Sequence, residues 1–183
     1  MVEKNDCKRE RYEKYNRLRN NYMNKEQFFF IKRVKNRFLF KLFTIAKLPL
    51  GFIAGLKVLN LNENQCSTSV GYKYLNKNPF QSTYFAVLNM AAELSTGVLA
   101  LLATKGRAPS VAVIIVSMKA DFQKKATDTI TFTCSDGEKF FRAVDKAIET
   151  KEPQIATVAT VGKNENGEIV STCEFTWSFK ERS

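Results

Sequence analysis

The sequence predicts an α+β protein in which an antiparallel sheet wraps around one long central helix, preceded by an extra amphipathic helix. Two observations predict this arrangement. Residues 84–103 carry a single charge and are apolar on nearly every side of a helix, so they need cover all round. Segments with the two-residue alternation of β-strands precede and follow them, and a curved sheet is the simplest cover for such a helix.

The residues before this core predict a separate basic arm. Residues 1–50 contain 14 Lys and Arg against 5 Asp and Glu, whereas the rest of the chain contains 15 against 13. Within residues 28–46 apolar side chains form a helical stripe between basic ones: Ile31, Val34, Phe38, Leu42 and Ile45. Pro49 and Gly51 then end the helix. We therefore expect an arm with an amphipathic helix over residues 1–47 and a main domain over residues 48–183.

The arm leaves two arrangements open. The helix over residues 28–46 either packs against its own domain or lies on an anionic membrane surface. Its Lys and Arg residues recur every few positions, which excludes a transmembrane span. Residues 1–27 are charged, rich in Asn and poor in aliphatic residues, which is typical of an exposed helix or a frayed tail.

Six strands are expected, with a second helix between the fourth and fifth. The strands cover residues 56–62, 66–76, 111–118, 128–134, 154–162 and 168–180. Asn166-Gly167 predicts a type I′ hairpin, so the last two strands should pair antiparallel. Ser135 to Glu138 reads as a capping box that opens a helix bearing Phe140 on its apolar side.

Composition excludes several kinds of chemistry. The chain has no histidine, which excludes Ser-His-Asp and Cys-His catalysis and His-ligated metal sites. Its four cysteines lie far apart without a CxxC pair, so reduced thiols in a cytoplasm are expected rather than disulfides. Any reaction must then use carboxylates, hydroxyls, lysines or backbone donors, and we expect no metal.

Glu93 is the one charge on the long apolar helix. Burial of a carboxylate without a partner costs free energy or raises its pKa, so either a hydrogen bond satisfies Glu93 or the group has a chemical role. Helical spacing places Asn89, Thr96 and Gly97 on the same side as Glu93. These small and polar residues would let a ligand or another backbone approach closely.

This order of elements, together with short motifs, resembles the hot-dog fold of the acyl-CoA thioesterases, including the phenylacetate-pathway and 4-hydroxybenzoyl-CoA types. Asn78–Phe80 stands where that family has an Asn or Gln before the helix. Glu93 matches the family's acidic position and Gly97 the glycine that follows it. The resemblance spans residues 50–180. Where the family has His-Gly-Gly, this chain has Tyr84–Ala86.

The resemblance implies hydrolysis of acyl-CoA or acyl-carrier-protein thioesters by a cytoplasmic homodimer or dimer of dimers. Glu93 would act as general base or nucleophile, and Asn78 would orient the water or the carbonyl. Backbone N–H groups near Tyr84 and Phe85 would polarise the carbonyl. Coenzyme A would enter only as part of the substrate. Other expected contacts to the substrate are Phe85, Asn89, Thr96, Gly97, Lys119 and Lys124, with Lys105, Arg107 and Lys125 as further candidates for the phosphates.

The replaced His-Gly-Gly keeps a second function open, a module that binds acyl chains without hydrolysing them. Hydratase chemistry on this fold normally uses a histidine and is disfavoured. Nucleic-acid binding is supported only by the basic arm and its interleaved aromatic residues, and we expect no nucleic-acid partner. Contact with a membrane periphery through the N-terminal helix remains an expectation of the basic amphipathic pattern.

Overall fold

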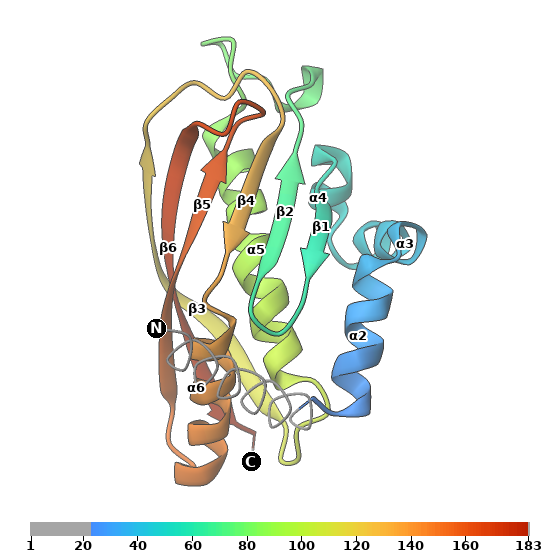
Figure 1. The fold of residues 1–183 in the computed structure, drawn as a ribbon, viewed down its shortest axis with the longest axis vertical. Coiled ribbons are helices and arrows are strands. Elements are labelled where there is room, and N and C mark those ends of the chain that lie inside the picture. Colours follow the sequence, from blue (N-terminus) through green and yellow to red (C-terminus); the bar gives the residue numbers. More distant parts are fainter. Residues whose placement is uncertain (1–22, 183) are drawn as a thin grey trace, which may run out of the picture.

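The long helix and the sheet around it form as predicted (Figure 1). The structure is a computed structural model that describes residues 23–182. Within these residues one antiparallel sheet holds six strands in the order β1-β2-β4-β5-β6-β3. The central helix α5 (Phe85–Thr104) lies in the concave side of the sheet, and α6 (Gly137–Thr150) packs against α5 and β5. The predicted α+β fold is therefore confirmed.

All six strands occur near their predicted positions. They are β1 (Lys57–Leu61), β2 (Cys66–Val70), β3 (Val111–Phe122), β4 (Ile130–Cys134), β5 (Gln154–Lys163) and β6 (Ile169–Glu181). The second strand is shorter than predicted, because the chain turns away after Val70 into a short 3₁₀ helix, η1 (Tyr74–Asn76). The buried Asn76 holds this turn: its Nδ2 donates to the carbonyl oxygens of Ala54 and Gly71, both at 2.9 Å.

Two local predictions were wrong, although the elements they served are present. Strands β5 and β6 pair antiparallel, but Gly167 N donates to Asn164 O, and Asn166 lacks the positive φ that a type I′ turn requires. The capping box at Ser135 does not form either. Helix α6 has Asp136 at its N-cap without a side-chain capping bond, because the Asp136 carboxylate instead accepts from Ala159 N on β5 at 3.0 Å.

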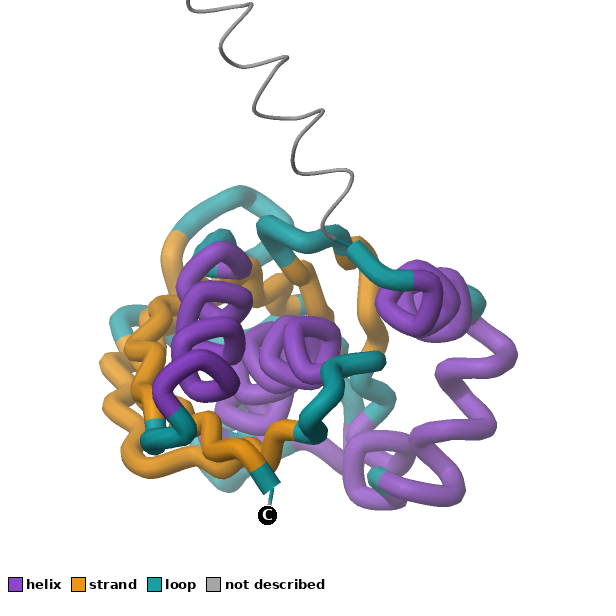
Figure 2. Tube along the Cα trace, turned by 90° about the horizontal axis from the view of Figure 1, so that it is seen from below, coloured by secondary structure: helices purple, strands orange, loops and turns teal. Residues whose placement is uncertain are grey.

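The single helix predicted for residues 28–46 is divided into two, α2 (Lys25–Lys35) and α3 (Arg37–Lys47), and a short further helix, α4 (Pro49–Ala54), follows them. The three helices stand beside β1 at one side of the molecule (Figures 1 and 2). Asn36 breaks the helix because its Oδ1 accepts from the backbone N–H groups of Phe38 and Leu39, both at 3.1 Å, and so caps α3. Residues 1–22, where most of the expected tail falls, lie outside the described residues.

The exposed side of α3 is the apolar one. Phe40 and Thr44 are the residues that this helix buries, whereas Phe38, Leu42 and Ile45 from the predicted stripe face solvent. On α2 the stripe behaves as expected for packing, because Val34 is buried and Ile31 packs against the core. The stripe is therefore amphipathic as predicted, but its apolar side chains pack against the core only before Asn36.

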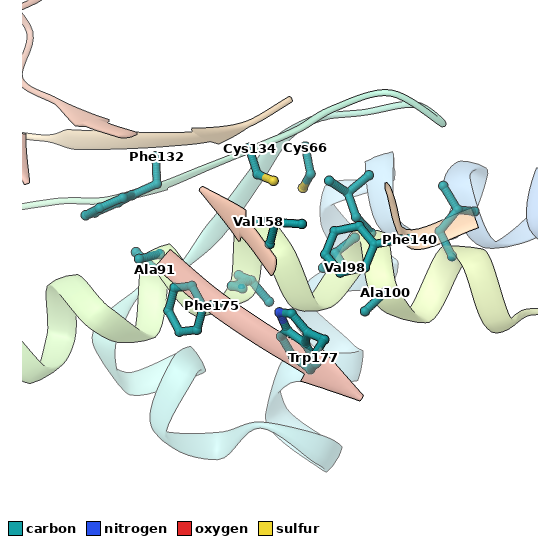
Figure 3. Packing of buried hydrophobic residues seen from close by; sticks show 14 of the residues in the cluster. Cys66, Ala91, Val98, Ala100, Phe132, Cys134, Phe140, Val158, Phe175 and Trp177 are labelled. Atoms are coloured by element: carbon teal, nitrogen blue, oxygen red, sulfur yellow. The ribbon is translucent and has the colours of Figure 1, made fainter. Parts of the chain in front are cut away.

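The core gathers around α5 (Figure 3). Side chains of β2, β4, β5 and β6 surround the helix, among them Cys66, Phe132, Val158 and Trp177. Three of the four cysteines fall within the described residues, and all three are free and buried. Among the described residues α5 is the one helix long and apolar enough to span a membrane, but 61% of its most apolar window is buried inside the protein, as expected for a core helix.

Replacing Phe140 by Ala should test the docking of α6. The Phe140 ring is fully buried against the rings of Trp177 and Phe179, so Phe140→Ala should lower the free energy of unfolding by about 3–5 kcal/mol. The control is Phe80→Ala, since the Phe80 side chain is 74% exposed and its loss should cost less than about 0.5 kcal/mol. Urea denaturation measures both values. Equal losses in the two variants would contradict the packing of α6.

Candidate active site

Glu93 lies in the middle of α5 with its carboxylate over Gly97. A Cβ atom added to Gly97 would come 2.8 Å from Glu93 Oε1 and 3.3 Å from Cη2 of Trp177, so the space beside this glycine holds the carboxylate against the indole. Glu93 is half-buried, and among the described residues no hydrogen bond or ion pair joins its carboxylate to another group. Because Gly97 has no side chain, there is room for the Glu93 carboxylate beside the indole; we call this space the seat of the carboxylate.

The surroundings of Glu93 favour its neutral form. Desolvation by burial raises the pKa of this carboxyl above its usual value of 4.5, and no cation lies close enough to offset that cost. A carboxylate with a raised pKa can accept a proton more readily at neutral pH than an ordinary surface glutamate. Burial thus gives Glu93 the basicity that general-base chemistry requires.

Trp177 and Thr96 form the wall behind Glu93. The indole Nε1 of Trp177 donates to Thr96 Oγ1 at 3.3 Å, and that hydroxyl in turn donates to the backbone carbonyl of Glu93 at 3.0 Å. Both side chains are buried, and the bond between Trp177 and Thr96 links β6 to α5. Thr96, a predicted substrate contact, is buried and engaged with the Glu93 backbone and the Trp177 indole.

One turn earlier on the helix, Asn89 faces a second pair of polar residues on β6. The thiol of the buried Cys173 donates to Asn89 Oδ1 with a sulfur–oxygen distance of 3.8 Å, and it lies 3.5 Å from the hydroxyl of Ser171. Burial raises the pKa of the Cys173 thiol, which keeps it protonated and suited to donate. Asn89 and Glu93 therefore belong to one polar row between α5 and β6.

The N-terminus of α5 carries exposed aromatic rings and free backbone donors. Tyr84 is the N-cap residue without a side-chain capping bond, and its ring meets that of Phe85 at a centroid distance of 4.9 Å. Phe85 in turn lies 6.2 Å from the ring of Phe122 on β3. Among the described residues no acceptor pairs with the N–H groups of Phe85 and Ala86. Such donors at a helix N-terminus attract developing negative charge.

Asn78 shapes the loop before α5. Its Oδ1 accepts from the backbone N–H groups of Phe80 at 2.9 Å and Ser82 at 3.2 Å, and its Nδ2 donates to Ser82 Oγ at 3.0 Å. The side-chain amide is thus engaged on both atoms within the loop. In this structure Asn78 positions the approach to Tyr84 instead of pointing a free amide at a ligand.

The basic residues expected near a substrate do not gather in one place. Lys119 on β3 is exposed and pairs with Asp121 at 3.6 Å, and Lys124 forms an ion pair with Glu168. Lys125 lies near the carbonyl of Phe80, by the loop before α5. Lys105 and Arg107 lie at the other end of α5, where Arg107 pairs with Asp145 at 2.9 Å.

Glu93 and the free donors of α5 lie far apart in one chain. Eight residues separate Glu93 from Phe85, which corresponds to about 12 Å along a helix that rises 1.5 Å per residue. A reacting carbonyl must lie within about 3 Å of both a base-held water and its oxyanion donors. Within a single chain the two features therefore do not converge on one atom.

Sequence reasoning missed Trp177, Cys173 and Ser171 as parts of this site. The alternation along residues 168–180 placed every second residue on the inner side of the last strand, but alternation does not give the register against the helix. A polar residue at an inward-facing position, such as Ser171, was the sequence feature that could have indicated a site residue on this strand. Within residues 23–182, no cluster of three or more Cys, Asp or Glu residues lies where it could hold a metal ion.

The fold of this chain is the hot-dog fold, as the resemblance implied, and the solved structures that share this fold include proteins described as thioesterases. The structure of PA5026 from Pseudomonas aeruginosa, described as a probable thioesterase, superposes with a TM-score of 0.68 at 20% identity, covering 78% of this chain and 93% of that one. Thioesterase HI1161 from Haemophilus influenzae gives a TM-score of 0.57 at 12% identity, covering 76% and 88%. The E. coli PaaI protein from the phenylacetic acid degradation operon gives 0.56 at 11%, covering 76% and 88%.

The chain belongs to the family described as a domain of unknown function, DUF4442, whose sequence profile matches residues 36–179. No curated protein sequence matches the chain. The profile begins at Asn36 and ends at Phe179, so it includes α3, α4 and all of the sheet except the last two residues of β6. The division of the chain between residues 47 and 48 remains a prediction.

Replacing Glu93 by Gln should change how stability depends on pH. Because the folded-state pKa of Glu93 is raised, the native protein binds more protons than the unfolded chain above pH 4.5, so its stability falls as pH rises through the folded pKa. Glu93→Gln should therefore be more stable than wild type at pH 7, and this difference should vanish below pH 4.5. Urea denaturation across this range measures it.

The matched control is Glu174→Gln on β6, whose side chain is exposed. This variant should show the same stability difference from wild type, close to zero, at pH 4 and pH 7. A Glu93→Gln variant that loses stability at pH 7 would mean that the carboxylate has a stabilising partner.

Proposed function

We propose that this protein hydrolyses acyl thioesters of coenzyme A or of acyl-carrier protein, with Glu93 as the general base. The observation that carries the proposal is the half-buried, unpaired carboxylate seated over Gly97, with its pKa raised by burial. The hot-dog fold, and the thioesterases among the proteins that share it, support the class of reaction.

In the proposed reaction Glu93 takes a proton from a water molecule while that water attacks the thioester carbonyl. The new C–O bond forms as the carbonyl oxygen becomes negative, and backbone N–H groups at Phe85 and Ala86 stabilise that charge. The C–S bond then breaks, and the leaving thiolate takes the proton from Glu93. In the alternative route with the same residue, the carboxylate attacks the carbonyl directly and expels the thiolate, and water then hydrolyses the mixed anhydride to the acid and free Glu93.

The separation of Glu93 from the N-terminus of α5 favours a site shared by two subunits. Strand β3 supports a homodimer, because it is an edge strand of twelve residues that leaves apolar side chains exposed: Ile114, Ile115, Val116, Met118 and Phe122. Long apolar edge strands are normally covered, since they would otherwise pair with other chains. A two-fold dimer would place Glu93 of one subunit with the α5 donors of the other, twice over.

Activity should depend on the Glu93 carboxylate. With a panel of acyl-CoAs and a thiol reagent, Glu93→Gln should lower kcat by about 10²- to 10⁴-fold, the usual contribution of a general base. Gly97→Ala should also lower kcat, because the added methyl group displaces the carboxylate while the helix itself tolerates Ala. Glu174→Gln, at an exposed position of β6 between the buried Cys173 and Phe175, should keep wild-type kinetics.

Full activity in Glu93→Gln would contradict the assigned role of this residue. Retained fatty acid or acyl-CoA with no thiol release in the wild-type protein would instead favour the non-catalytic acyl-binding module. The replacement of His-Gly-Gly by Tyr84–Ala86 is the feature that favours that second function.

A mixed dimer should show whether the site is shared. Ala86→Pro removes one free N–H in the first turn of α5, where proline is tolerated. Each homodimer, Glu93→Gln or Ala86→Pro, should have strongly reduced activity. A hybrid of the two, isolated through different tags, should regain about half the wild-type activity, because one of its two sites combines an intact acid with intact donors. A hybrid as inactive as both parents would place each site within one subunit.

A further inference from the structure

The N-terminal helices present an apolar face that nothing in the described structure covers. On α3 and α4 eight large apolar side chains are exposed: Phe38, Leu39, Leu42, Phe43, Ile45, Leu50, Phe52 and Ile53. On α3 the exposed apolar residues are contiguous, spanning roughly 160° of the helix circumference at 3.6 residues per turn. Phe38 alone is 68% exposed. We refer to these eight residues as the α3–α4 face.

The charge around this face has one sign. Residues 36–55 contain Arg37, Lys41 and Lys47 and no acidic residue. A cleft of about 590 Å³ beside α3 is lined by four cations, Lys35, Arg37, Lys41 and Lys57, and by apolar side chains that include Phe40. A cleft lined by both cations and apolar side chains suits a ligand with an anionic head attached to an apolar tail.

Charge argues against two other occupants of the face. Two copies meeting there across a two-fold axis would bring Arg37, Lys41 and Lys47 of each copy against one another with no acid to neutralise them. Residues 1–22 of the same chain have few aliphatic side chains and carry seven Lys and Arg against four Asp and Glu. That segment therefore has neither the apolar side chains to cover the face nor the negative charge to neutralise its cations.

We propose that the α3–α4 face docks the protein on the surface of an anionic phospholipid bilayer. The apolar side chains enter the boundary between headgroups and acyl chains, while the flanking Lys and Arg meet anionic headgroups, as in other interfacial amphipathic helices. The break at Asn36 makes this orientation available, because it lets α3 leave the line of α2, which is anchored to the domain through Val34. The proposal does not rest on thioesterase activity.

Vesicle co-sedimentation of the full-length protein tests the proposal. The protein should bind vesicles that contain phosphatidylglycerol and should bind pure phosphatidylcholine vesicles much more weakly. The double variant Phe38→Ser/Leu42→Ser and the double variant Lys41→Glu/Lys47→Glu should each weaken binding to the anionic vesicles by about tenfold or more. High salt should weaken wild-type binding because it screens the cationic contribution.

The controls carry one substitution of each kind, apolar to Ser and Lys to Glu, elsewhere on the surface. Ile155→Ser, at an apolar side chain of β5 that is 62% exposed, and Lys163→Glu, at an exposed lysine of the same strand, should bind like the wild type. Circular dichroism and light scattering should show unchanged folding and oligomeric state in all variants. Three results would each overturn the proposal: no binding to anionic vesicles, equal binding by the α3–α4 variants and the wild type, or dissociation of an oligomer by Phe38→Ser/Leu42→Ser.

Discussion

A helix enclosed by a sheet must satisfy its polar groups inside the protein, and this constraint governs the structure around α5. Its side-chain hydroxyls meet it by bonding to the helix backbone and to the surrounding strands: Ser95 contacts Thr160 at 2.8 Å and donates to Ala92 O at 2.7 Å. Thr68 on β2 donates to Ala91 O, also at 2.7 Å. Each such hydrogen bond contributes roughly 1 kcal/mol to stability. Removal of one partner costs more, because it leaves a buried polar group without a hydrogen bond. Against this background an unpaired Glu93 is the exception.

The sequence predicted the helix, the six strands and their antiparallel arrangement, because these depend on periodic patterns of apolar residues. The predictions from sequence were wrong where one side chain has more than one possible hydrogen-bond partner. Asn36 could have continued a helix or capped a new one, and Asp136 could have capped α6 or bonded to β5. The Asn36 cap is local, formed with residues two and three positions later, but an Asn is compatible with either choice. The bond from Ala159 N to Asp136 forms only when β5 meets the start of α6. At the site, spacing identified Asn89, Thr96 and Gly97 beside Glu93, whereas Trp177 required the register of β6 against the helix.

The replaced His-Gly-Gly has a structural counterpart at the start of α5. Tyr84 and Phe85 bring two rings to the position where small residues would leave the backbone open, and Phe122 extends that cluster onto β3. The amide donors nevertheless stay unpaired, because the rings stand beside the first turn without capping it. An aromatic cluster of this kind suits contact with an apolar or planar group better than with a polar one.

Gly97 also offers a way to sort related sequences. The seat of the carboxylate depends on two positions four residues apart on one helix, an acid and a glycine, and on an aromatic residue from the last strand. A larger residue at the glycine position would take up the space that the carboxylate occupies beside the indole. A Glu-x-x-x-Gly pair on the central helix is thus the sequence pattern that this arrangement requires.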